Sequence, residues 1–149
     1  DKRIREWCFG SFDGAYDGDL FMGLIPRIFN VDHVHQLSYA ELAEGLVEVD
    51  TAGWAEGWEK LSGRIKEVFE AIAKEMEEQG GGNALVVSHG MTIGTIVYLI
   101  NGMHPHGLDN GSVTILEYED GQFSVEVVGD RSYRELGREK MEEASIKSV

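Results

Sequence analysis

The stretch that decides the fold is Ala84-Leu85-Val86-Val87-Ser88-His89-Gly90, and a helix-like run from Met91 to Ile100 follows it directly. A short apolar run that contains β-branched residues and stops at a polar His-Gly pair is typical of a buried strand. The sequence therefore predicts a strand over 84–88 that turns at once into a helix. In open α/β sheets, ligands bind in the crevice at this carboxyl end of the strands.

His89 stands at the expected junction between strand and helix. The free N–H groups at the start of a helix suit an anion such as phosphate, and a histidine can titrate near neutral pH. Two interpretations stay open on position alone. One is a phosphate-site histidine, and the other is a buried histidine that bonds a backbone carbonyl.

Size and composition indicate one soluble domain over residues 1–149, of which 42% are hydrophobic and 27% charged. The net charge of −14 argues against nucleic acid as a partner. No apolar run is long enough to cross a bilayer and no signal peptide is visible, so no membrane partner is expected. Cys8 is the single cysteine, which excludes an internal disulfide and favours a reducing, cytoplasmic location.

Capping and periodicity signals predict two helices in the middle of the chain. Ser38 and Glu41 fit a capping box, so a helix is expected from there to about Val47. Apolar residues three and four apart over 54–76 predict a long helix, which the glycines at 80–82 end.

Strand and turn signals predict a β-hairpin in the last third of the chain. Strands are expected over 113–118 and 123–128, joined by a type I′ turn at Asp120-Gly121, and the last twenty residues are expected to be helical. Residues 15–37 are expected to be irregular, with the apolar stretch 20–25 as a lid, a pocket wall or plain core.

Several familiar catalytic and nucleotide-binding patterns do not fit. Ser88 is not in a nucleophile elbow, because Val86 stands where G-x-S-x-G needs glycine. Cys8 lacks the arginine of C-x5-R, since that position is Gly14. The chain has neither G-x-G-x-x-G nor G-x4-G-K-[ST].

Two histidine pairs, His33 with His35 and His104 with His106, have a spacing seen in metal sites. Carboxylates are too common in this chain to identify a third ligand, so exposed or core histidines are the preferred interpretation. No metal and no cofactor are expected.

Glu6 is the best candidate for a partner of His89, because Trp7 and Phe9 flank it. A carboxyl packed against aromatic rings would have its charged form disfavoured, as a general acid requires. The alternative is a surface glutamate that pairs with Arg3 or Arg5.

Three segments stand out together: R-I-R-E-W-C-F-G-S-F-D-G at 3–14, V-S-H-G at 87–90 and N-G-S-V at 110–113. In the same order they resemble the L-x-E-x-x-F-G-x-x-E-G segment, the second histidine motif and the N-x-S-V strand entry of the histidine phosphatase superfamily, which includes the phosphoglycerate mutases. The resemblance implies an α/β fold in three layers, with a mostly parallel sheet flanked by helices.

The resemblance also implies phosphoryl transfer through a phosphohistidine, without a metal, on a small phosphorylated metabolite. The glutamate that matches Glu6 protonates the leaving oxygen, and the histidine that matches His89 binds the phosphoryl oxygens. A homodimer stays open. The candidate substrate contacts are Ser88, Gly90, Asn110, Arg5 and Arg27.

The chain departs from the family pattern because it has no R-H-G motif, which carries the nucleophilic histidine. We therefore expect the carboxy-terminal part of such a domain, truncated before residue 1, with an open edge in its sheet. Residues 5–10 lack the L-N-E-R-H-Y-G of the mutases, which favours a phosphatase of small phosphomonoesters. The alternative is a non-catalytic fragment that binds a phosphorylated ligand or another chain.

Overall fold

The computed structural model describes residues 1–105 and 108–146, which contain helices and one antiparallel sheet of two strands. The α-helices are α1 (Asp17–Asp19), α2 (Ile25–Phe29), α3 (Tyr39–Val49), α4 (Trp58–Glu78), α5 (Gly90–Asn101) and α6 (Ser132–Ile146). The strands are β1 (Val113–Glu119) and β2 (Gln122–Asp130). Short 3-10 turns lie at Lys2–Ile4, Gly10–Phe12 and Val34–Gln36, and a π-helical segment, Leu20–Leu24, joins α1 to α2.

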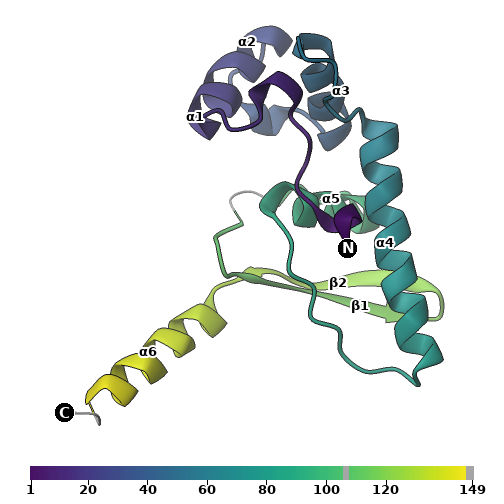
Figure 1. The fold of residues 1–149 in the computed structure, drawn as a ribbon, viewed down its shortest axis with the longest axis vertical. Coiled ribbons are helices and arrows are strands. Elements are labelled where there is room, and N and C mark those ends of the chain that lie inside the picture. Colours follow the sequence, from purple (N-terminus) through teal and green to yellow (C-terminus); the bar gives the residue numbers. More distant parts are fainter. Residues whose placement is uncertain (106–107, 147–149) are drawn as a thin grey trace.

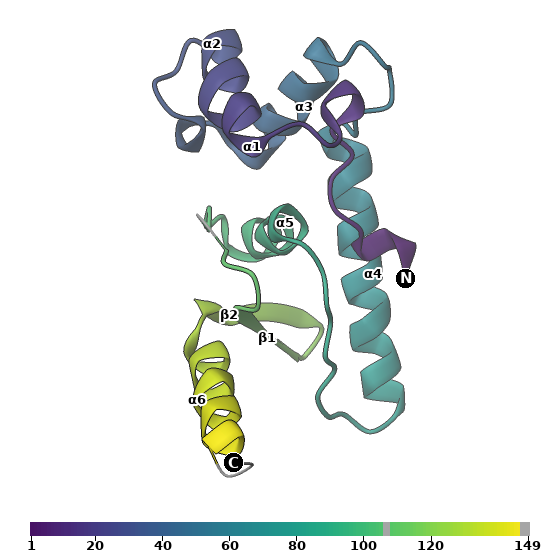
Figure 2. The ribbon, with the colours of Figure 1, turned by 60° about the vertical axis from the view of Figure 1, so that its left-hand side comes forward.

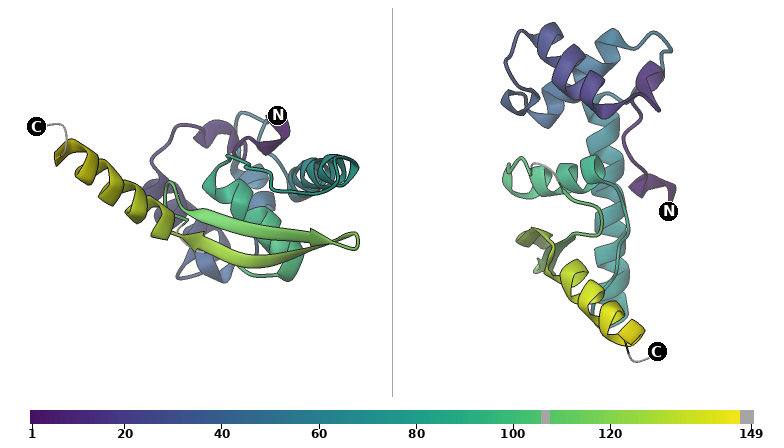
Figure 3. Two further views of the ribbon diagram at one scale, coloured as in Figure 1. Left: turned by 90° about the horizontal axis from the view of Figure 1, so that it is seen from below. Right: turned by 90° about the vertical axis from the view of Figure 1, so that its left-hand side faces the viewer.

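The elements form a helical group at one end and a helix-on-hairpin layer at the other (Figure 1). α1, α2 and α3 make up the group, and α4 runs from it along the length of the molecule. α5 lies between that group and the β1–β2 hairpin, as Figure 2 shows from a second direction. Figure 3 shows α6 leading away from the hairpin. None of the described helices is both long and apolar enough to cross a membrane.

Local signals correctly predict where α3 begins and where α4 ends. The Glu41 N–H donates to Ser38 Oγ at 3.1 Å, and the Ser38 N–H donates to Glu41 Oε2 at 2.7 Å, which completes the expected capping box. At the end of α4, the Gly81 N–H donates to the carbonyl of Met76 at 2.8 Å, and Gly80 has a φ of 90°. This is the glycine-dependent helix end that the sequence predicts.

The hairpin and the last helix are also confirmed. Asp120 and Gly121 have φ angles of 52° and 81°, as a type I′ turn requires at its two central positions. β1 and β2 pair around this turn, and α6 follows.

The core forms where the first residues of the chain, α3, α4 and α5 meet. The expected apolar stripe of α4 is buried there through Leu61, Ile65 and Val68, together with Trp7. Trp54 is not part of this stripe, because α4 begins only at Trp58 and the Trp54 side chain is 60% exposed. Including Trp54 in the helical spacing is therefore wrong.

The expected strand over 84–88 is not formed. A strand needs a neighbour to receive its N–H and C=O groups, and in the described residues no strand pairs with this segment. Leu85 and Val87 are consequently 92% and 78% exposed. The prediction of a mostly parallel sheet in three layers does not hold for the described residues, where α-helices accompany one antiparallel hairpin.

The expectation of an irregular segment over 15–37 is wrong for residues 17–29, which are helical throughout. Pro26 lies in the first turn of α2, a position where proline is common. Leu20 and Ile25 are core residues, whereas Phe21 lines a cavity, so this segment is both core and pocket wall.

Candidate active site

The Glu6 carboxylate lies against the N-terminus of α5. It accepts hydrogen bonds from the N–H groups of Met91 at 3.2 Å and Thr92 at 3.0 Å, and from the N–H of Trp7 at 3.0 Å. A helix N-terminus attracts negative charge, because its first N–H groups have no partner within the helix. Two N–H groups that were expected to face a phosphate therefore hold Glu6 instead.

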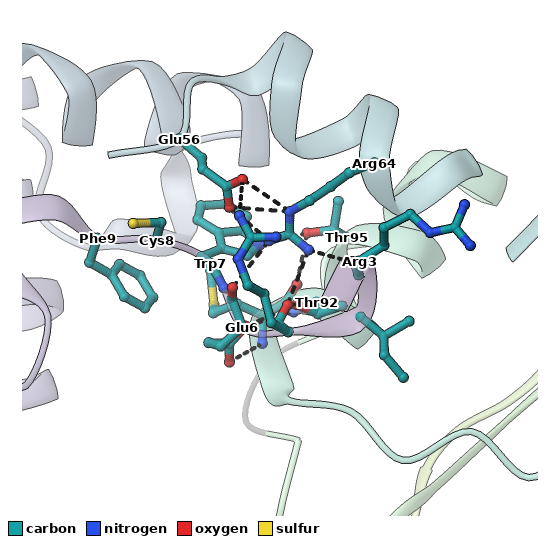
Figure 4. A network of polar contacts seen from close by, with 12 residues as sticks. Arg3, Glu6, Trp7, Cys8, Phe9, Glu56, Arg64, Thr92 and Thr95 are labelled. Atoms are coloured by element: carbon teal, nitrogen blue, oxygen red, sulfur yellow. Dashed lines mark hydrogen bonds and ion pairs between the residues drawn. The ribbon is translucent and has the colours of Figure 1, made fainter. Parts of the chain in front are cut away.

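Two buried threonines of α5 contact the residues on both sides of Glu6, the main chain of Arg5 and the side chain of Trp7 (Figure 4). Thr92 Oγ1 donates to the Arg5 carbonyl at 2.7 Å and lies 3.1 Å from Glu6 Oε1. Thr95 Oγ1 accepts from Trp7 Nε1 at 3.0 Å. These contacts attach the segment that carries Glu6 to the first turns of α5.

A buried ion pair attaches the same segment to α4 (Figure 4). Arg64 Nη2 lies 2.8 Å from Glu56 Oε2, and the Arg64 guanidinium also donates to the carbonyls of Arg3, Arg5 and Glu6 at 2.7 to 3.1 Å. Burial acts to raise the pKa of Glu56, but the hydrogen bonds and charge of Arg64, aided by Arg5, outweigh it and hold that pKa below its ordinary value. Arg64 therefore positions the backbone of the candidate acid.

The surface-pair alternative for Glu6 is wrong. Arg3 pairs with Asp1 at 2.6 Å, and Arg5 pairs with Glu56. Arg5, a predicted substrate contact, thus has a carboxylate partner in the structure.

His89 is the N-cap residue of α5 and is exposed. The interpretation as a buried histidine is therefore wrong. Gly90 is the first residue of the helix, and in the described part of the chain no acceptor receives its N–H. Ser88 Oγ donates to the Ile4 carbonyl at 2.6 Å, so this hydroxyl connects the 84–89 segment to the start of the chain.

Arg27 and Asn110, two further predicted substrate contacts, lie elsewhere. Arg27 is exposed on α2 and lines a separate hollow of about 410 Å³ together with Asn30. Asn110 lies in the turn before β1, and its carbonyl accepts from Arg134 Nη1 at 3.0 Å. Within residues 1–105 and 108–146, no hydrogen bond or ion pair joins either residue to Glu6.

A cavity of about 180 Å³ opens beside Met91, the α5 residue whose N–H donates to Glu6. Phe21, Tyr39 of α3 and Met91 of α5 contribute to its largely apolar walls. The Tyr39 hydroxyl donates to the carbonyl of Pro105 at 3.4 Å. Burial, together with the charge of Glu6, raises the pKa of Tyr39 to about 12.

Asp50 connects the Gly10–Phe12 turn to the segment over 52–55. Its carboxylate accepts from four main-chain N–H groups at 2.7 or 2.8 Å, those of Ser11, Ala52, Trp54 and Ala55. Desolvation acts to raise the pKa of Asp50, but these four donors hold it well below its ordinary value. Gly10 has a φ of 64°, and a Cβ at this position would collide with the Asp50 carboxyl group.

The histidine pairs do not form a metal site in the part of the chain that the structure describes. There, no three His, Cys, Asp or Glu side chains gather closely enough to hold an ion. His106 lies outside the described residues.

Thr92, Thr95, Glu56 and Arg64 are site residues that the sequence did not reveal. The two threonines had a detectable signal, because they lie three residues apart just after His89. The Glu56–Arg64 ion pair had no detectable sequence signal. Glu56 precedes α4, Arg64 lies within α4, and the spacing of the two residues matches no known motif.

Two comparisons with known proteins identify the family of this chain. A family model described as "Histidine phosphatase superfamily (branch 1)" matches residues 26–131. A solved phosphoglycerate mutase from Bacillus anthracis str. Sterne is similar with a TM-score of 0.80 and 35% identity. The match covers 89% of this chain and 60% of that protein, so the chain spans about 60% of its length. No curated protein matches the sequence significantly. Because the family model covers most of the 149 residues, the chain belongs to the histidine phosphatase superfamily, branch 1.

Proposed function

We propose that this chain supplies the general acid and the second histidine of a site that transfers a phosphoryl group through a phosphohistidine. The observation that carries the proposal is the contact of the Glu6 carboxylate with the first turn of α5, directly after His89 and Gly90. Family membership and the similarity to a phosphoglycerate mutase support the reaction class.

The proposed reaction begins when a histidine outside these 149 residues attacks the phosphorus of a phosphate monoester. The P–O ester bond breaks, its electron pair stays on the leaving oxygen, and Glu6 gives that oxygen a proton. Water then attacks the phosphohistidine and gives a proton to the Glu6 carboxylate. Inorganic phosphate leaves, and the attacking histidine and the protonated Glu6 are restored.

His89 and Gly90 are assigned to the phosphoryl oxygens. The exposed imidazole of His89 and the Gly90 N–H at the start of α5 are donors of the kind that stabilise charge on a phosphoryl group in transfer. Contacts of Ser88, Asn110 and Arg27 with substrate stay predictions.

Hydrolysis fits the site better than a mutase reaction. Arg5 and Arg64 both pair with Glu56, so the charge of these two guanidinium groups is already partly balanced by a carboxylate of the chain itself. A small phosphorylated metabolite as substrate, a homodimer and a cytoplasmic location stay predictions.

A second candidate function is binding without catalysis, either of a phosphorylated ligand or of another chain. The exposed Leu85 and Val87 favour it, because an apolar segment without a neighbouring strand is a surface for another polypeptide.

The proposal is tested on the 149-residue chain by NMR, with inorganic phosphate as the probe. We expect phosphate to shift the Gly90 amide and the His89 ring signals, and His89→Ala to weaken that binding. His33→Ala, at the residue that caps the 3-10 turn before α3, is the control and should bind phosphate as the unsubstituted chain does. A Gly90 signal that does not move in saturating phosphate would overturn the proposal.

Rates of phosphate ester hydrolysis test two further parts of the proposal, the place of the nucleophile and the role of Glu6 as the acid. The chain alone should not hydrolyse 4-nitrophenyl phosphate, and hydrolysis would show that the nucleophile is among these 149 residues. In a protein that also carries the nucleophile, Glu6→Gln should slow esters of weakly acidic alcohols most. Equal slowing of all esters would show that Glu6 is not the acid.

A further inference from the structure

The cavity beside Glu6 is assembled from separate parts of the chain. Phe21 comes from the π-helical segment, Val34 from the turn before α3, Tyr39 from α3 and Met91 from α5. Its volume is about 180 Å³. An apolar cavity of about 150 Å³ is large enough for a benzene ring. The space therefore suits one aromatic ring or a short hydrocarbon chain.

Met91 joins this cavity to the candidate acid. It lines the cavity, and its own N–H donates to Glu6 Oε2 at 3.2 Å. Tyr39, on another wall, is near enough for the Glu6 charge to act on its hydroxyl. Met91 thus connects the wall of the cavity to the carboxyl group of Glu6.

The position of the cavity near Glu6 matters because the leaving oxygen of a phosphate monoester is bonded to a carbon atom. An oxygen that takes a proton from Glu6 remains bonded to the carbon of the departing alcohol. The carbon skeleton of that alcohol must occupy space beside the carboxyl group, and the cavity provides such space.

The walls lack the cations that a charged alcohol would need. Among the described residues that line the cavity there is no arginine or lysine, and its basic groups are the imidazoles of His35 and His104. The His104 ring stacks on Tyr39 with the ring centroids 5.1 Å apart. A carboxylate or second phosphate placed here would lose its hydration without gaining a guanidinium or ammonium partner.

We propose that this cavity binds the alcohol portion of a phosphate monoester, and that this portion is an aromatic ring or a short hydrocarbon rather than an anionic hydroxy acid. The assignment rests on the proposed phosphoryl transfer at Glu6. It names the substrate class that the site prefers.

The test uses 4-methylphenol as a stand-in for the leaving alcohol, with the 149-residue chain and methyl NMR. We expect the probe to shift the Met91 methyl signal and to give direct proton contacts with it. Val34→Asp should weaken binding about tenfold, because it places a charge in an apolar wall. Val47→Asp, an exposed position of α3, is the matched control and should bind the probe normally. The contacts in the unsubstituted chain decide the question even if Val34→Asp does not fold.

A second arm compares substrates. Phenyl phosphate should shift both Gly90 and Met91, whereas 3-phosphoglycerate should not enter the cavity. Phosphate binding at Gly90 without 4-methylphenol binding would overturn the cavity assignment alone. Binding of 4-methylphenol without phosphate binding would overturn the proposed function, and the substrate assignment with it. Entry of 3-phosphoglycerate would overturn the preference for an apolar alcohol.

Discussion

The Arg64 guanidinium donates to the main-chain oxygen of Glu6 at 3.1 Å, although the two residues are 58 positions apart. The candidate acid is therefore held by α5 through its carboxylate and by α4 through its backbone. Arg64 carries this second attachment while it also neutralises the buried Glu56.

Arg64→Met should lower the free energy of unfolding by about 3 kcal/mol, because it leaves the Glu56 carboxylate buried with only part of its compensation. Urea denaturation at neutral pH measures the change. Lys66→Met, on the exposed side of α4, is the control and should stay within about 0.5 kcal/mol. The double variant Glu56→Leu/Arg64→Met should recover part of the loss, and equal losses for Arg64→Met and Lys66→Met would contradict this account.

Gly10→Ala should destabilise the chain by at least about 1 kcal/mol more than Gly14→Ala. Both glycines have positive φ, 64° and 82°, so both substitutions strain the backbone. Only at position 10 does the new methyl group collide with the Asp50 carboxyl, whereas the space around Gly14 is open. Thermal unfolding of the two variants isolates the cost of the collision, and equal melting temperatures would show that the loop simply shifts.

Asp50 should contribute to the loss of stability in acid. Its pKa is lowered in the folded chain, so its contribution is present above the pKa of an unfolded aspartate and is lost as the pH falls through the folded pKa. Asp50→Asn should therefore be less stable than the unsubstituted chain at about pH 7 and should lose less on acidification to about pH 3. Urea denaturation at both pH values checks this, and parallel losses would remove Asp50 from the acid transition.

Tyr39 should ionise well above the ordinary pKa of a tyrosine. Its folded pKa of about 12 lies above the ordinary value of 10, so its contribution to stability is complete below pH 10 and is lost as the pH rises through 12. Phenolate absorbance during an alkaline titration should show a late step that Tyr39→Phe abolishes. A titration that is the same in shape for both proteins would contradict the burial of this hydroxyl.

Leu85→Lys and Val87→Lys should reduce self-association of the chain, because these side chains are 92% and 78% exposed on a segment that pairs with no strand in the described residues. Sedimentation velocity over a range of concentrations measures the effect. Met22→Lys is the control, since Met22 is 83% exposed on a helical surface instead. If all three substitutions act alike, general surface hydrophobicity and not the unpaired segment drives association.

The sequence predicted those features that depend on neighbours along the chain. The Ser38–Glu41 capping box and the Asp120-Gly121 turn involve residues at most three positions apart, and both are confirmed. The strand over 84–88 was predicted from its own composition, but a strand also needs a partner, which this segment lacks in the described residues.

The supporting contacts of the site were not predictable for a related reason. Motif resemblance pointed to Glu6 and His89, yet what positions Glu6 comes from α4 and α5, through Arg64 and Thr92. Such long-range contacts arise from packing and leave no periodic trace in a single sequence.

The Thr92 hydroxyl has one hydrogen atom, and the Arg5 carbonyl at 2.7 Å, which can only accept, receives it. Glu6 Oε1, 3.1 Å from the same hydroxyl oxygen, is a second acceptor within reach of that one hydrogen atom. The Thr92 side chain thus serves both the backbone and the carboxylate of one short segment, whereas a valine of the same shape would leave both acceptors with one donor fewer.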